Sequence, residues 1–196
     1  MTHQQACHGR AFSIMTGNDY PCRMTFLAFA AFTLFVVHEF EEIIRCRPWI
    51  ERHESEARYA RDMWIRNRRA YPSTETIAAM ILEEVILAAI ILLIASSSGY
   101  LSLVFAVVFG NSLHLVGHII SAMASKAWNP GSITAAMTLP FNIAILIIVW
   151  MHTIARVRFG ALQIFTASII ITAVLVANLS MLHHISPRLD AMIHRG

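Results

Sequence analysis

The chain has 196 residues, of which 57% are hydrophobic and only 14% are charged. This composition is too apolar for an ordinary soluble domain and is typical of an integral membrane protein. The formal net charge of +3 comes mostly from one basic segment, so we expect no nucleic-acid partner. Cys7, Cys22 and Cys46 are widely spaced and form no CxxC pair, which excludes a disulfide framework and a zinc–thiolate site.

Residues 1–23 are polar and lack the features of a secretory signal, so we predict a mobile N-terminal tail. A bilayer core about 30 Å thick requires about 20 apolar residues in a helix, and five stretches meet this requirement. They are residues 24–44, 76–97, 100–124, 132–155 and 162–182. We therefore predict an all-α fold, a polytopic transmembrane helix bundle with about five spans. A single domain covers residues 24–183, and residues 184–196 form a C-terminal tail.

An arginine-rich segment separates the first two stretches. Apolar or aromatic residues recur in it every three or four positions, at Trp49, His53, Ala57, Ala60 and Trp64. This period predicts an amphipathic interfacial helix over about 47–70 that lies on the membrane surface. A solvated helical loop is the alternative.

The distribution of Lys and Arg predicts the orientation. With an odd number of spans and the N-terminus outside, eleven of the fifteen Lys and Arg residues fall on the inner side. Because basic residues collect on the cytoplasmic side of membrane proteins, we expect the N-terminus out and the C-terminus in. The lipid bilayer is then the main partner, and the sequence predicts no particular oligomeric state.

Ionisable residues lie inside these apolar stretches, where an isolated charge is costly and usually functional. In the first stretch, His38, Glu41 and Glu42 stand at i, i+3 and i+4, which places them on one helix face. Glu39 points elsewhere, and we expect it to pair with an arginine or a lipid headgroup. The later stretches add Glu83 and Glu84, and then His114 and His118 on one face with Asn111.

The depths of these residues indicate that they belong to one site. Counted from the predicted inner end of each span, they lie in a common layer roughly 5–15 Å below the cytoplasmic surface, at 1.5 Å per residue. The predicted metal ligands are His38, Glu41, Glu42, Glu83, His114 and His118. Such a nitrogen and oxygen set suits a divalent ion, Zn or Fe first and Mn as well, with room for two ions. A buried hydrogen-bond network is the alternative.

Several of these motifs occur in the same order in a known family. The chain resembles the HXXEE-motif integral membrane proteins, which are bacterial proteins of largely undefined function. The resemblance rests on His38-Glu39-Phe40-Glu41-Glu42, Pro48-Trp49, Glu83 or Glu84, His114 with His118, and Pro130, Gly131, Ile133, Thr134 and Ala135. It covers roughly residues 25–160 and implies a shared polar site in a multi-pass protein of the bacterial inner membrane. In this chain Asn129 precedes the Pro-Gly pair, and the basic loop is long.

The residues favour a membrane-embedded, metal-dependent enzyme, a hydrolase acting on a lipid-like or otherwise apolar substrate. Glu42 and Glu84 are the predicted catalytic carboxylates, acting where they do not bind the metal. A di-iron oxidoreductase with the same ligands is a second hypothesis. A small proton or divalent-cation transporter is a third, but it requires polar residues through to the outer surface. A structural protein without metal is a fourth.

Overall fold

The computed structural model describes residues 20–195, which form helices joined by short connections. The elements are α2 (Tyr20–His53), η1 (Ala57–Tyr59), α3 (Met63–Arg66), η2 (Arg68–Ala70), α4 (Thr74–Ser98), α5 (Leu101–Ser125), α6 (Ser132–Arg156) and α7 (Gly160–Ile193). The described part of the chain contains no strand, so the all-α prediction is confirmed. The predicted tail over residues 1–23 lies largely outside the described residues.

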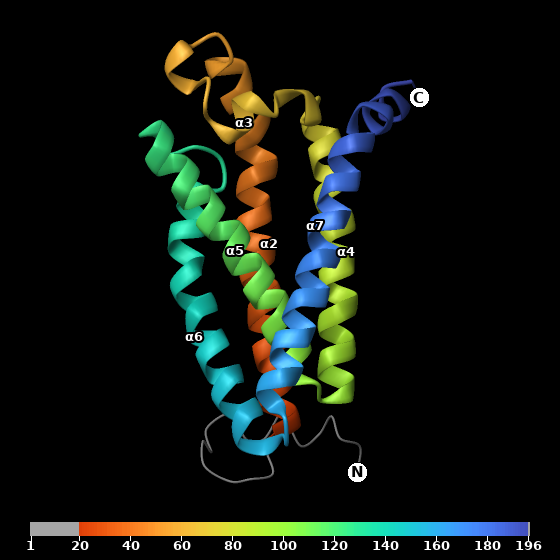
Figure 1. The fold of residues 1–196 in the computed structure, drawn as a ribbon. Helices are drawn as coiled ribbons and strands as arrows, with labels where there is room; N and C mark the ends of the chain where they lie inside the picture. The colour runs from red at the N-terminus through yellow and green to blue at the C-terminus, as the bar shows by residue number, and fades with distance from the viewer. Residues whose placement is uncertain (1–19, 196) are drawn as a thin grey trace.

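The five long helices form an elongated bundle with α5 at its centre (Figure 1). Helix α5 contacts α2, α4, α6 and α7. Helix α4 starts at Ser73, whose hydroxyl accepts a hydrogen bond from the Thr76 backbone N–H, and it ends at Gly99 with a φ of 75°. Both are standard signals for helix ends. The connecting segment between α2 and α4 and the end of α7 lie at the same end of the bundle (Figure 1).

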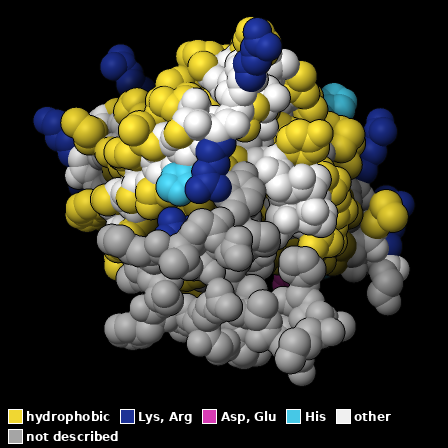
Figure 2. All heavy atoms as spheres, turned by 90° about the horizontal axis from the view of Figure 1, so that it is seen from below, with side chains coloured by type: hydrophobic (Ala, Val, Ile, Leu, Met, Phe, Trp, Pro, Cys, Tyr) yellow, Lys and Arg dark blue, Asp and Glu magenta, His cyan; other side chains and the backbone are white. Residues whose placement is uncertain are grey.

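The outer surface of the bundle is apolar, as expected for a protein in lipid. Large hydrophobic side chains such as Leu93 and Ile169 are each 70% exposed, and soluble monomers rarely expose continuous apolar patches of this kind. Seen from the end opposite the connecting segment, much of the described surface is hydrophobic, with scattered Lys and Arg (Figure 2).

Within residues 20–195, four helices, α4 to α7, are long and apolar enough to cross a membrane. The membrane prediction is therefore supported by these helices. The remaining stretch predicted to span, residues 24–44, lies in α2. Helix α2 runs alongside the other four (Figure 1), and its role as a fifth span stays a prediction.

The segment predicted as one surface helix over 47–70 is built differently. Helix α2 continues to His53, and the rest consists of the short turns η1, α3 and η2. Its aromatic residues pack on protein, because Trp64 is buried in a cluster with Ile50 and Tyr71, whereas Ala57 and Ala60 are exposed. At the end of α2, outside the predicted spans, His53 Nδ1 forms a hydrogen bond with Glu56 Oε1 at 2.5 Å. This hydrogen bond lowers the pKa of the Glu56 carboxyl.

Helix α7 continues to Ile193, through most of the segment 184–196 that was predicted as a C-terminal tail. At about 1.5 Å per residue, its 34 residues extend roughly 51 Å, well beyond a bilayer core. The extension is held by Asp190, whose Oδ1 accepts hydrogen bonds from Ser73 Oγ at 2.6 Å and Thr76 Oγ1 at 2.8 Å. A carboxylate is favourable there because it faces the N-terminus of α4.

Candidate metal centre

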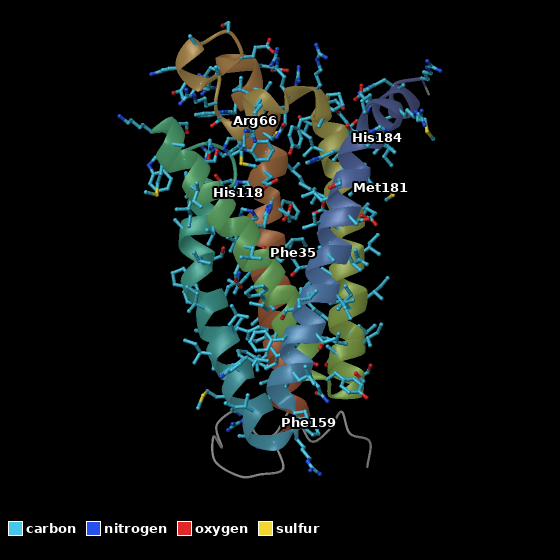
Figure 3. All side chains as sticks on the ribbon, viewed as in Figure 1. Phe35, Arg66, His118, Phe159, Met181 and His184 are labelled. Atoms are coloured by element: carbon cyan, nitrogen blue, oxygen red, sulfur yellow. The ribbon has the colours of Figure 1, made fainter. Side chains whose placement is uncertain are left out.

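Four of the residues predicted for the site converge between α2 and α5. His38 and Glu42 come from α2, and His114 and His118 come from α5. Each offers one ligand atom, and these atoms all lie within 4.8 Å of one another. The i, i+4 spacing puts each pair on one helix face, and the two faces meet. Figure 3 shows His118 below Arg66 of the connecting segment and above Phe35, deeper in the bundle.

The distances in this cluster are those of a ligand set around one point. Glu42 Oε1 lies 3.2 Å from His38 Nε2, 3.2 Å from His114 Nε2 and 2.8 Å from His118 Nε2. The Nε2 atoms of His114 and His118 are 3.0 Å apart. A tetrahedral zinc ion with ligands at about 2.0–2.1 Å holds its donor atoms roughly 3.3 Å apart. Four of these donor pairs are thus close to the spacing around such an ion, and the widest pair, within 4.8 Å, has to close on binding.

A backbone hydrogen bond determines which ring nitrogen of His118 carries the proton. Its Nδ1 lies 3.0 Å from the backbone oxygen of Pro130. A carbonyl only accepts hydrogen bonds, so Nδ1 carries the proton and donates it. In the neutral ring the lone pair is then on Nε2, which faces Glu42 and His114. This is the usual arrangement of a metal-ligating histidine, whose other nitrogen donates to a fixed acceptor.

His38 is oriented in the same way, but through a side chain. Thr134 Oγ1 donates to Glu41 Oε2 at 2.6 Å, so it accepts the hydrogen bond from His38 Nδ1 at 3.0 Å. The lone pair of neutral His38 therefore also lies on Nε2. That atom is buried and has no hydrogen-bond partner, although Glu42 Oε1 is nearby. Two groups that both accept thus face each other, an arrangement that a cation between them would stabilise.

The other predicted ligands lie elsewhere. Glu41 is turned to α6, where it accepts hydrogen bonds from the backbone N–H of Thr134 at 2.7 Å and from its hydroxyl, and it forms an ion pair with Arg45. Glu83 is exposed and accepts a hydrogen bond from Asn178 Nδ2 at 2.7 Å. Glu41 therefore supports the cluster from behind, and Glu83 does not reach it.

Glu84 and Glu39 line the cavities beside the cluster. A cavity of about 300 Å³ lies between α2, α4, α5 and α7, and both carboxylates and His114 border it. A second cavity of about 130 Å³ reaches Glu42 and leads to the connecting segment at Trp64 and Tyr71. The sequence placed Glu39 away from the site, toward arginine or lipid, but it is only 2% exposed. Small molecules can therefore approach the cluster from the His114 and Glu42 side.

The turn between α5 and α6 contains residues that support the cluster. The sequence predicted no functional role for them. Gly131 adopts a φ of 79°, and a β-carbon added at this position would lie only 2.6 Å from His118 Nδ1. Trp64 Nε1 donates a hydrogen bond to Pro130 O at 3.1 Å, the same carbonyl that orients His118. Pro130, Gly131 and Thr134 all belong to the Pro-Gly segment that carries the family resemblance. The Pro-Gly motif was therefore the sequence feature that could have indicated these supporting roles.

Asp62 joins the connecting segment to this turn. Its Oδ1 accepts from the Trp64 backbone N–H at 2.9 Å, and its Oδ2 accepts from Asn129 Nδ2 at 2.9 Å. Asp62→Ala removes a helix cap and a buried acceptor, so we expect a loss of about 1–3 kcal/mol in stability. Thermal unfolding in detergent measures this loss. Glu54→Ala, which removes an exposed pair with Arg68, is the control and should change little. Equal unfolding temperatures for the two variants would contradict this role of Asp62.

The fold and the cluster together define an α-helical membrane protein with a buried His/Glu centre. The chain belongs to the family described as "Protein of unknown function with HXXEE motif", whose model matches residues 29–145, more than half of the chain. The predicted family is thereby confirmed, and the motif corresponds to His38, Glu41 and Glu42. No curated protein and no solved structure matches the chain.

Proposed function

We propose that this protein is a membrane-embedded metal-dependent enzyme, with one divalent ion held by His38, Glu42, His114 and His118. The observation that carries the proposal is the convergence of three histidine nitrogens on one carboxylate oxygen, at 2.8–3.2 Å. Two of these histidines have their lone pairs directed inward by fixed hydrogen bonds. Three nitrogens and one oxygen suit Zn(II), with Fe(II) and Mn(II) as alternatives.

The contacts of Glu41 and Glu83, the two predicted ligands outside the cluster, favour a single ion. A di-iron centre requires further carboxylates to bridge or complete the coordination. Glu41 is engaged by Thr134 and Arg45, and Glu83 is engaged by Asn178. This distribution supports hydrolysis over di-iron oxidation.

The reaction we propose is hydrolysis of an amphiphilic substrate. An ion held by these residues would supply Lewis acidity and would lower the pKa of a water that occupies a fifth position. Glu84 borders the cavity together with His114 and has no hydrogen bond or ion pair with other described residues, so it is available as the general base. The apolar walls of the cavity, including Phe35, Ala88 and Leu175, exclude bulk water and hold the substrate's chain.

A transport path is less well supported. The half of the bundle away from the cluster is filled by a continuous apolar core, which contains Ala28, Leu92, Val104 and Val149 among others. An ion that crossed the membrane would have to pass this core, where no ionisable side chain is buried among the described residues. A site that opens at one end suits an enzyme.

Elemental analysis of the protein purified in detergent tests the metal centre. We expect about one Zn, Fe or Mn per wild-type chain, and loss of that metal in His118→Ala. His152→Ala is a matched control, because His152 lies near the far end of α6 and its ring bonds only to the backbone oxygen of Ile148 among the described residues. A wild-type protein that stays folded in EDTA and takes up none of the three metals would refute the proposal.

Hydrolysis itself is tested with a panel of alkyl esters and amides in micelles. The wild type is expected to release product at a rate that falls at least 100-fold in Glu84→Gln. The metal content of Glu84→Gln should stay at the wild-type level, because Glu84 is a proposed base rather than a ligand. Equal activity in the two proteins would exclude Glu84 as the base.

A further inference from the structure

The cavity between α2, α4, α5 and α7 has a polar end of unusual composition. Its polar lining consists of Glu39, Glu84, Asn111, His114 and Asn178, and the rest of its lining is apolar. No Lys or Arg is among the described residues that line it. The polar end is therefore rich in hydrogen-bond acceptors and carries no fixed cation.

Two of these acceptors are buried without a partner. Glu39 is 2% exposed and forms no hydrogen bond or ion pair with other described residues. Asn111 is 8% exposed, and its Oδ1 atom has no hydrogen-bond partner. Because an unpaired buried acceptor costs about 1–3 kcal/mol and a carboxylate more, these groups favour a ligand that brings donors and positive charge.

The rest of the cavity fits an alkyl chain. Phe35, Ala88, Val107, Leu113, Leu175, Val176 and Leu179 form its walls. Its volume of about 300 Å³ is in the range of small-molecule sites. Leu113 and Val176 are also exposed on the lipid-facing surface. The lining of the cavity is therefore continuous with the exposed surface of α5 and α7, and this is the side from which a chain would enter.

We propose that this cavity binds a cationic amphiphile, an alkyl chain that ends in a protonated amine. The ammonium group lies between Glu39 and Glu84 and donates to Asn111 Oδ1, and the chain lies against α5 and α7. An anionic headgroup, a phosphate or carboxylate, is rejected because the same carboxylates repel it and no cation compensates it. This inference rests on the proposed function, because hydrolysis of an N-alkyl amide by water breaks the C–N bond and releases a carboxylate and an alkylamine of this class, with Glu84 passing the proton of the water to the leaving nitrogen. The amine end lies beside His114 and hence beside the cluster.

Photolabelling tests the proposal on the full chain in nanodiscs of neutral lipid. Three probes share one diazirine-bearing decyl chain and end in an amine, a hydroxyl or a carboxylate, and labelled peptides are mapped by mass spectrometry. We expect the amine probe to label α7 around residues 175–179 at least tenfold more than the carboxylate probe, with the hydroxyl probe between them. An excess of unlabelled decylamine should suppress the labelling. This competition uses the wild-type protein and therefore does not depend on whether a variant folds.

Variants then locate the headgroup. Glu39→Gln and Glu84→Gln should each lower labelling by the amine probe at least fivefold and leave labelling by the hydroxyl probe unchanged. Glu83→Gln is the matched control, because this neighbouring carboxylate is exposed and bound to Asn178. Equal labelling by the amine and carboxylate probes, or unchanged amine labelling in Glu39→Gln, would overturn the proposal.

Each measurement is repeated in EDTA to separate the two proposals. Selective amine labelling in a wild type that binds no metal would support the cavity assignment and refute the metalloenzyme. Stoichiometric metal with no preference among the probes would refute the cavity assignment and leave the metal centre intact.

Discussion

Replacement of Glu42 by glutamine is expected to abolish stoichiometric metal binding, whereas the same change at Glu41 should weaken it by about 10–100-fold. The two adjacent carboxylates of the motif have different tasks. Glu42 Oε1 lies within 3.2 Å of three histidine nitrogens, so its charge is part of the ligand set. Glu41 acts through Thr134, which orients His38. Metal titration followed by elemental analysis separates a lost ligand from a weakened support.

Two controls make the comparison specific. Glu83→Gln changes a carboxylate that does not reach the cluster, so it should bind metal as the wild type does. Thr134→Val removes the link between His38 and Glu41 and should resemble Glu41→Gln. If Glu41→Gln lost all metal and Glu42→Gln kept it, the ligand assignment would be reversed and the arrangement described above would be wrong.

The cluster of His38, Glu42, His114 and His118 was predictable because it depends mainly on helix geometry. His38 with Glu42 and His114 with His118 each stand four residues apart, which fixes a shared face before any tertiary contact is known. Their similar depth in the bundle follows from the 1.5 Å rise per residue. The structure brings these four residues together, as both arguments require.

The division of labour between Glu41 and Glu42 was not predictable in this way. At i+3 and i+4 from His38, both glutamates point to the same side of α2. Helical periodicity therefore does not show which of them is the ligand. The choice is made by Thr134 and Arg45, which bind Glu41 and turn it aside. Thr134 belongs to α6, 93 residues away in sequence, and no local pattern reveals that contact.

Glu39 was expected to pair with an arginine or a lipid headgroup, but it is buried, because its face of α2 also packs on protein. Helix α2 contacts α4 as well as α5 and α6, so a residue on a second face can also be buried. The connecting segment between α2 and α4 also packs on protein, although a helix on the membrane surface was predicted there. Its aromatic period predicts an apolar surface but does not say whether lipid or protein covers it, and Trp64 packs against Tyr71 and His118.

Gly131→Ala is expected to remove metal binding although residue 131 offers no ligand. A β-carbon at this position would lie 2.6 Å from His118 Nδ1 and 3.1 Å from Glu42 Oε1. The first distance is shorter than any normal contact, and the His118 ring has little freedom because Pro130 O holds it. The ring must therefore turn or the turn must open. Either change moves His118 Nε2 away from the other ligands.

Gly99→Ala is the control that isolates this clash from backbone strain. Both glycines have a positive φ, 79° at Gly131 and 75° at Gly99, but a β-carbon at Gly99 meets nothing within 4 Å. Each substitution should cost about 1–2 kcal/mol from the left-handed backbone alone. Only Gly131→Ala should lose the metal, and it should also unfold at a lower temperature than Gly99→Ala. Wild-type metal content in Gly131→Ala would mean that His118 is free to move at no cost, and a rigid, preorganised centre would then be excluded.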